Sequence, residues 1–111
     1  MDYAWSITPE KISAAVQRLA AVGKPRKIIL FGSAARGRAG INSDADFLVI
    51  TKKEVPPRRE SVRLRKALKD IMMPMDIVVI SEEKFRALAQ QPGLVYREAL
   101  QSGRVLYEAE D

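Results

Sequence analysis

Three aspartates that lead apolar runs are the residues in this chain whose type and spacing suit chemistry. Asp44 and Asp46 precede the run at 47–50, and Asp76 precedes the run at 77–80. On a β-strand the side chains at i and i+2 share a face, with their backbones roughly 6–7 Å apart. If the strand that follows Asp76 lies beside the one that holds Asp44 and Asp46, three carboxylates meet at one edge of a sheet.

The chemistry of such a cluster follows from its charge and from the residues that the chain lacks. Neighbouring carboxylates resist ionisation unless a cation compensates them. The chain has no histidine and no cysteine, so a metal would be held by oxygen atoms, which suit Mg²⁺ or Mn²⁺. The same absence excludes histidine bases, Ser-His-Asp triads and nearly all catalytic zinc sites. A pair of divalent ions can polarise a phosphoryl group and activate an attacking hydroxyl. Taken singly, each aspartate is as well explained as a turn residue, so the prediction depends on the combination.

A glycine-serine pair directly after an apolar run is the second feature. At Gly32-Ser33 the glycine allows a sharp turn and close approach of a phosphate, and backbone amides with the Ser33 hydroxyl can receive anionic oxygens. Arg36 and Arg38 follow closely and can neutralise charge. A Gly-Ser pair alone predicts only a tight turn.

Together these features resemble the signature of the DNA polymerase β-like nucleotidyltransferase superfamily. The signature is Gly32-Ser33, ten residues, then Asp44-x-Asp46. The Ala-Arg-Gly after the serine and the Ser-Asp at the pair are similar to its minimal, MNT-type branch. Asp76 matches the setting of the third carboxylate, and the segments 96–100 and 103–107 resemble the end of such domains. The likeness covers roughly residues 10–108, with Ala45 at a position where a β-branched aliphatic residue is commoner.

The resemblance implies a fold, a reaction and a cofactor. It implies an α+β fold with a small mixed sheet, divalent metal (Mg²⁺ or Mn²⁺) and a nucleoside triphosphate, usually ATP. Gly32, Ser33 and, nearby, Arg36 would contact the nucleotide. Asp44, Asp46 and Asp76 would form the metal-binding and catalytic set, with Asp76 helping to deprotonate the acceptor hydroxyl.

The resemblance also implies a partner. Similar proteins are commonly encoded beside a HEPN-domain ribonuclease toxin, and the transferase acts as antitoxin by adding AMP to a tyrosine of that toxin. Larger relatives have a second domain for the acceptor, which a chain of 111 residues lacks room for. The acceptor is then expected on a partner, on another copy of the chain or on a shallow surface.

The elements that must position these residues follow from apolar periodicity and punctuation. Helices are predicted over about 9–23, 58–71, 82–89 and 94–101, and strands over 27–31, 44–51, 75–80 and 105–107. Thr8 and Pro9 read as the start of the first helix and Gly23 as its end, while Pro74 prevents the second helix from continuing. Residues 32–43 form a long loop with room for one helical turn. One α+β domain spanning 1–111 is predicted.

Two surface features leave alternatives open. The basic helix at 58–71 is explained most simply as a solvated face, and otherwise as a patch for an acidic partner or RNA. Trp5 and Tyr3 are expected to cover the edge of the core, with anchoring of a partner as the alternative. Met72, Met73 and Met75 suit core filling or an adaptable contact surface.

Composition restricts the setting more than the reaction. The net charge is +5, from 19 Lys and Arg against 14 Asp and Glu, which is compatible with nucleotides, RNA or an acidic protein. No apolar stretch approaches the ~20 residues of a membrane span. The start of the chain has no secretory pattern, so a cytoplasmic protein is expected. Besides a transferase, two other classes remain: an antitoxin that neutralises its partner by contact alone, and an RNA-binding domain.

Overall fold

The computed structural model describes residues 4–35, 37 and 44–110. The elements follow in the order α1 (Pro9–Gly23), β1 (Lys27–Phe31), α2 (Gly32–Ala35), β2 (Ala45–Thr51), α3 (Pro57–Ala67), β3 (Met75–Ser81), α4 (Glu82–Leu88), α5 (Val95–Ser102) and β4 (Arg104–Glu108). The predicted order of helices and strands is thus confirmed, and the predicted helical turn after the first strand is α2.

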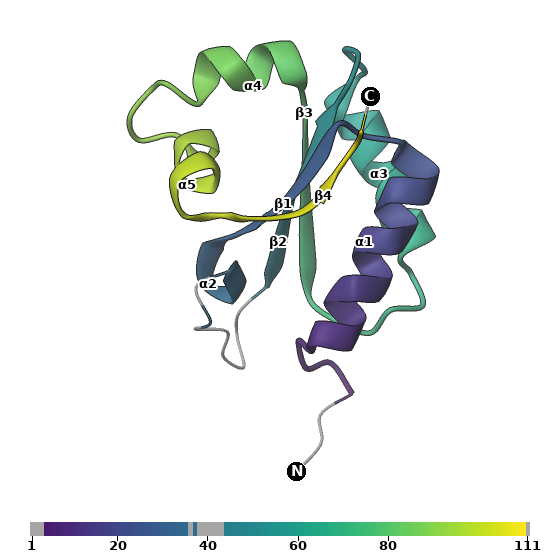
Figure 1. The fold of residues 1–111 in the computed structure, drawn as a ribbon. Helices are drawn as coiled ribbons and strands as arrows, with labels where there is room; N and C mark the ends of the chain where they lie inside the picture. The colour runs from purple at the N-terminus through teal and green to yellow at the C-terminus, as the bar shows by residue number, and fades with distance from the viewer. Residues whose placement is uncertain (1–3, 36, 38–43, 111) are drawn as a thin grey trace.

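The four strands form one mixed sheet in the order β3-β2-β1-β4. β1 runs antiparallel to both β2 and β4, while β2 and β3 are parallel. A parallel pair needs a crossover connection, and α3 provides it (Figure 1). The predicted α+β fold with a small mixed sheet is confirmed, and the strands expected to hold the aspartates are neighbours.

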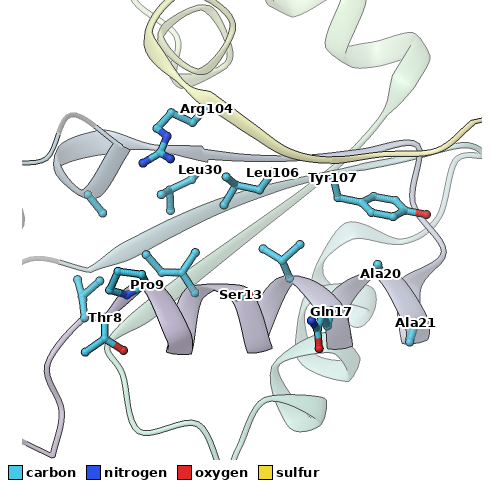
Figure 2. A pocket seen from close by; sticks show the side chains of 14 residues that line it. Thr8, Pro9, Ser13, Gln17, Ala20, Ala21, Leu30, Arg104, Leu106 and Tyr107 are labelled. Atoms are coloured by element: carbon cyan, nitrogen blue, oxygen red, sulfur yellow. The ribbon is translucent and has the colours of Figure 1, made fainter.

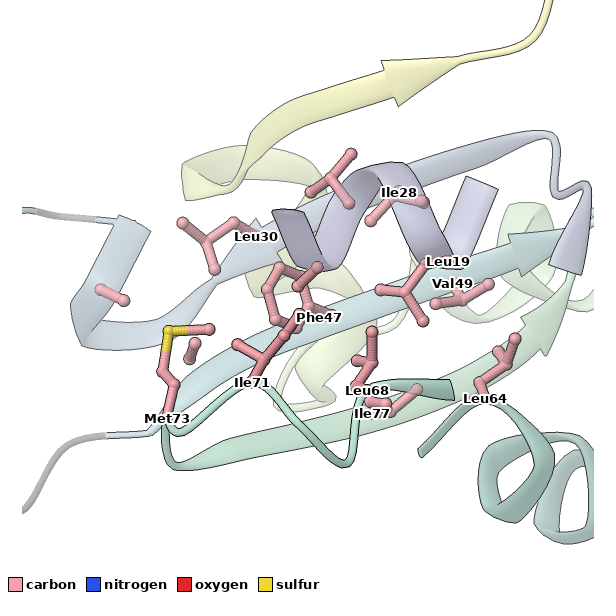
Figure 3. Packing of buried hydrophobic residues seen from close by; sticks show 14 of the residues in the cluster. Leu19, Ile28, Leu30, Phe47, Val49, Leu64, Leu68, Ile71, Met73 and Ile77 are labelled. Atoms are coloured by element: carbon pink, nitrogen blue, oxygen red, sulfur yellow. The ribbon is translucent and has the colours of Figure 1, made fainter. Parts of the chain in front are cut away.

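Alternation along β2 divides the core between the two faces of the sheet. Phe47 and Val49 are buried in a cluster that includes Leu19 of α1 and Leu64 of α3 (Figure 3). Leu48 and its neighbours on the same face belong to a second cluster with residues of α4 and α5. In Figure 1, α1 and α3 accordingly lie on one side of the sheet, and α4 and α5 on the other.

Both ends of α1 fall where they are predicted, at Pro9 and at Gly23. The Thr8 hydroxyl accepts a hydrogen bond from the Lys11 N–H at 3.2 Å, and Pro9 occupies the first turn. Gly23, predicted as the stop, is the last helical residue, and Lys24 takes the left-handed conformation (φ +45°). Gly23 is suited to its place for a different reason, because an added Cβ would lie 3.1 Å from Leu64 of α3.

Among the other boundaries that differ from the prediction, two bear on the core and on the site. α3 ends at Ala67, not at residue 71. Leu68 and Ile71 are nevertheless buried, and the Ile71 N–H donates to the Leu68 carbonyl at 2.9 Å in a turn that continues the chain toward β3. Their apolar spacing therefore reflects burial in a turn instead of helix. β2 begins at Ala45, so Asp44 stands just before the strand. Among the described helices, none combines the length and apolar character of a membrane span.

Candidate functional site

The strand register places two of the three predicted carboxylates side by side. Asp46 of β2 pairs directly with Asp76 of β3, and the backbones of paired strands lie about 4.8 Å apart. Just before the strands, the Ala45 N–H donates to the Pro74 carbonyl at 2.9 Å. This bond joins the segments that enter β2 and β3, and Asp44 precedes it immediately. Asp44 and Asp76 are exposed, whereas Asp46 is half-buried.

Asp46 is the carboxylate on which the negative charges of its neighbours act. Its pKa is raised, first by burial and then by the charges of Asp76, Asp44 and Glu98. Asp44 is close enough to act on Asp46, as the i and i+2 spacing predicts, and Asp76 acts from the neighbouring strand. Glu98, on α5, adds a fourth carboxylate that the strand pattern could not indicate. The arrangement therefore disfavours the ionised form of Asp46 unless a cation is present.

Gly32 brings the glycine-serine turn against this carboxylate. Phe31, the last residue of β1, pairs with Asp46, so the chain turns at Gly32 directly beside it. Gly32 has φ +75°, and an added Cβ would collide with Oδ2 of Asp46. The left-handed conformation thus favours glycine, and a larger residue there would require the Asp46 carboxylate to shift. Ser33 follows in α2 and is half-buried, while Arg36, the third predicted nucleotide-binding residue, lies outside the described residues.

Arg65 of α3 is a neighbour of the site that was predicted only as part of a basic helix. Its guanidinium lies 3.5 Å from Oδ1 of Asp76, and both side chains are about half exposed. The parallel crossover is the signal that could have indicated it, because the helix between two parallel strands packs beside the second of them. Arg65 therefore partly compensates the charge of Asp76.

The carboxylates suit a hard cation by their chemistry without forming a complete cage. In the ranges 4–35, 37 and 44–110, no group of three or more His, Cys, Asp or Glu side chains is placed to hold a metal ion. The register pair of Asp46 and Asp76, with Asp44 two residues before Asp46, nevertheless supplies oxygen ligands at a point where neighbouring carboxylates act on Asp46. These residues therefore fit Mg²⁺ or Mn²⁺, provided that Arg65 gives up or shares Asp76.

A large hollow lies away from the carboxylates, on the opposite face of the sheet. It occupies about 930 Å³ between α1 and β4, and its lining includes Ile12, Val16, Leu30 and Leu106 (Figure 2). None of the predicted site residues within the described part of the chain lines it. Its apolar walls and its position give it no part in the chemistry of the aspartates.

Comparison with known proteins bears on the fold as a whole. Residues 10–111 match the family model described as polymerase beta, nucleotidyltransferase. A structure assigned as a minimal nucleotidyltransferase is 28% identical, with a TM-score of 0.57 over 86% of this chain and 89% of that one.

Two structures of toxin–antitoxin pairs are also similar. One, of MntA–HepT, is 19% identical with a TM-score of 0.60, covering 95% of this chain and 76% of that one. Another contains AMP-PNP and is 21% identical with a TM-score of 0.56, covering 88% and 74%. At these identities the two likenesses show the shared fold. No curated protein matches the chain in sequence.

Proposed function

The chain belongs to the polymerase β nucleotidyltransferase family, and from this premise we propose that it transfers AMP from ATP to a hydroxyl group of a partner protein. The observation that carries the proposal is the register pairing of Asp46 with Asp76 beside Gly32. It gathers carboxylates at the point where the glycine-serine turn can receive a triphosphate. A purely binding module has no need of this juxtaposition.

Each residue of the site has a distinct proposed role. Gly32 lets the backbone approach the triphosphate, and the Ser33 hydroxyl and nearby amides receive its oxygens. Asp44 and Asp46, with Asp76, would hold Mg²⁺ or Mn²⁺, which when bound supplies charge stabilisation at the reacting phosphoryl group. Asp76, which is exposed on the edge strand, accepts the proton of the acceptor hydroxyl as the hydroxyl oxygen bonds to phosphorus and pyrophosphate leaves.

The proposed acceptor is a tyrosine of a HEPN-type toxin, and the chain would act as its antitoxin. Two observations support this reading. The similar solved structures include toxin–antitoxin pairs, one of them with AMP-PNP. The carboxylates also lie at an open edge of the sheet, since β3 is an edge strand and Asp76 is exposed. An acceptor on another protein can therefore reach Asp76 without a second domain of this chain.

The test is transfer of label from α-labelled ATP to a HEPN-type protein, with Mg²⁺ present. The variant Asp44→Asn with Asp46→Asn should lower the labelling rate at least about a hundredfold, because a bound divalent ion supplies several kcal/mol of transition-state stabilisation. Glu83→Gln, which removes an exposed carboxylate from α4, is the matched control and should label normally. Undiminished labelling by the double variant would refute the proposal. If a variant that no longer labels the toxin still protects cells fully, the chain neutralises the toxin by contact alone.

A further inference from the structure

A small hollow with a basic rim opens on the outer side of β3, next to the proposed site. We define this docking surface by Trp5, Arg65, Lys69 and Met75, which line a hollow of about 260 Å³. Its floor consists of apolar side chains that belong to the turn after α3 and to β3: Leu68, Ile71, Met73, Pro74 and Ile77. Except for Pro74, these floor residues are buried, so the hollow rests on the ordered core.

Trp5 is held at this surface although it is exposed. Its side chain is 58% exposed, whereas the sequence predicted that it would cover the edge of the core. The Lys11 ammonium donates to the carbonyls of Ala4 and Ser6 at 2.7 and 2.8 Å, and to that of Met72 at 2.8 Å. One side chain therefore fastens the residues on both sides of Trp5 to the turn that borders the hollow. An exposed tryptophan on a fastened segment, beside methionine and arginine, has the composition of a protein-binding hot spot.

The charge of this surface indicates the sign of the charge that its partner should carry. Two other basic side chains of α3 and α1 are paired, Arg63 with Glu60 and Arg18 with Asp70. In the part of the chain that the structure describes, Lys69 makes no ion pair, and neither does Lys66. On the rim, Arg65 is paired with Asp76, so among the described residues Lys69 is the positive charge of the rim that is left without an ion pair.

Arg65 connects this surface to the site. It lines the hollow and at the same time lies 3.5 Å from Oδ1 of Asp76. Met75 and Ile77 face the hollow while Asp76, between them on β3, points to the opposite face. The hollow and the Asp76 carboxylate therefore lie on the two faces of the same edge strand, and Arg65 is the side chain that touches both.

We propose that this surface docks the acceptor protein through an acidic segment that inserts an apolar side chain beside Trp5. The inference rests on the proposed function for the existence of an acceptor, and adds where it binds and by what chemistry. A protein fits better than RNA because the floor is aliphatic, whereas single-stranded nucleic acid is bound by rows of aromatic platforms.

Trp5 provides a direct readout, because it is the only tryptophan in the chain. The intact protein is titrated with a synthetic peptide that has a tyrosine and a leucine flanked by glutamates, and the emission of Trp5 is followed. Docking should shift or quench the emission, with an affinity that falls as salt is added. Lys69→Glu should weaken binding about five- to tenfold, as expected for reversing one exposed charge. Arg59→Glu makes the same change on α3 outside the hollow and is the matched control.

A second variant tests the fastening of Trp5. Lys11→Met keeps the length of the side chain and removes its donors. It should lower the fluorescence anisotropy of Trp5 and weaken peptide binding, while circular dichroism confirms the fold. Unchanged Trp5 emission with the acidic peptide would overturn the inference. Equal effects of Lys69→Glu and Arg59→Glu, or stronger binding of a lysine-flanked peptide or of poly(U), would also overturn it.

The outcomes separate this inference from the proposed function. The variant Asp44→Asn with Asp46→Asn should still dock the peptide, because it leaves the hollow intact. Docking without any nucleotide transfer by the native protein would count against the proposed function alone. Transfer to the partner that is unaffected by Lys69→Glu would count against the docking surface alone.

Discussion

At Gly32, the addition of a single carbon atom would disturb the site. It combines φ +75° with an added Cβ that would strike Oδ2 of Asp46. We expect Gly32→Ala to cost about 1–2 kcal/mol for the left-handed backbone and, in addition, to displace Asp46 and abolish Mg²⁺-dependent ATP binding. Gly93→Ala is the control, since Gly93 has φ +86° and no atom within 4 Å of the added Cβ. Chemical denaturation and calorimetry measure both effects, and equal losses of stability in the two variants would contradict the collision.

The raised pKa of Asp46 predicts how the free energy of unfolding depends on pH. Burial and the charges of Asp76, Asp44 and Glu98 raise its pKa above that of an unfolded aspartate. The folded protein therefore binds a proton more readily than the unfolded chain. From this group, the free energy of unfolding should fall as pH rises from the ordinary aspartate pKa through the raised one.

The same argument predicts whether a substitution of Asp46 raises or lowers the free energy of unfolding. Asp46→Asn should be more stable than the native protein above that pH window, and the difference should close below the ordinary aspartate pKa. Mg²⁺ should stabilise the native protein and leave the variant unchanged. Thermal unfolding across pH measures these differences, and a variant that is less stable at neutral pH without metal would contradict them.

At the scale of elements, the sequence predicts correctly which face of a strand a residue occupies. The alternation that put Asp46 on the face of Leu48 also fixed which core each residue of β2 joins, and the structure confirms it. Strand order was left conditional, because pairing joins residues far apart in the chain, and only the register shows Asp46 beside Asp76. Arg65 and Glu98 reach the site from helices through tertiary packing, so no local pattern could assign them.

The end of α1 offers a test of helix termination. Lys24 occupies the left-handed position (φ +45°) while its N–H donates to the Ala20 carbonyl at 3.0 Å. A side chain pays a conformational penalty there that glycine avoids. Lys24→Gly should therefore raise the free energy of unfolding by about 0.5 kcal/mol, after the greater freedom of glycine in the unfolded chain is subtracted. Lys24→Ala keeps a Cβ and should show no gain in denaturant unfolding, so a gain in both variants would point to the lysine charge instead.

At the scale of the whole molecule, the two sides of the sheet are covered unequally. α1 has 15 residues, a side-chain N-cap and three buried residues. On the side of the carboxylates, α5 has 8 residues, no side-chain cap and only Ala99 buried among its residues, while Leu100 is 52% exposed. Little apolar area therefore holds α5 to the sheet, and Glu98 on that helix adds repulsion toward Asp46.

This asymmetry predicts where the molecule opens first. Local unfolding takes its lowest free energies from elements with few buried apolar contacts. Amides of α5 should therefore exchange with deuterium at least tenfold faster than those in the middle of α1, a difference of about 1.4 kcal/mol in opening free energy. Mg²⁺ with AMP-PNP should slow exchange at the end of β1, in α2 and at the start of β2, and should also slow α5, because a bound cation removes the repulsion between Glu98 and Asp46. Mass spectrometry of exchanged peptides separates these segments. Exchange in α5 as slow as in α1, or a ligand effect confined to the side of α1 and α3, would show that the carboxylate-bearing side is not the weaker one.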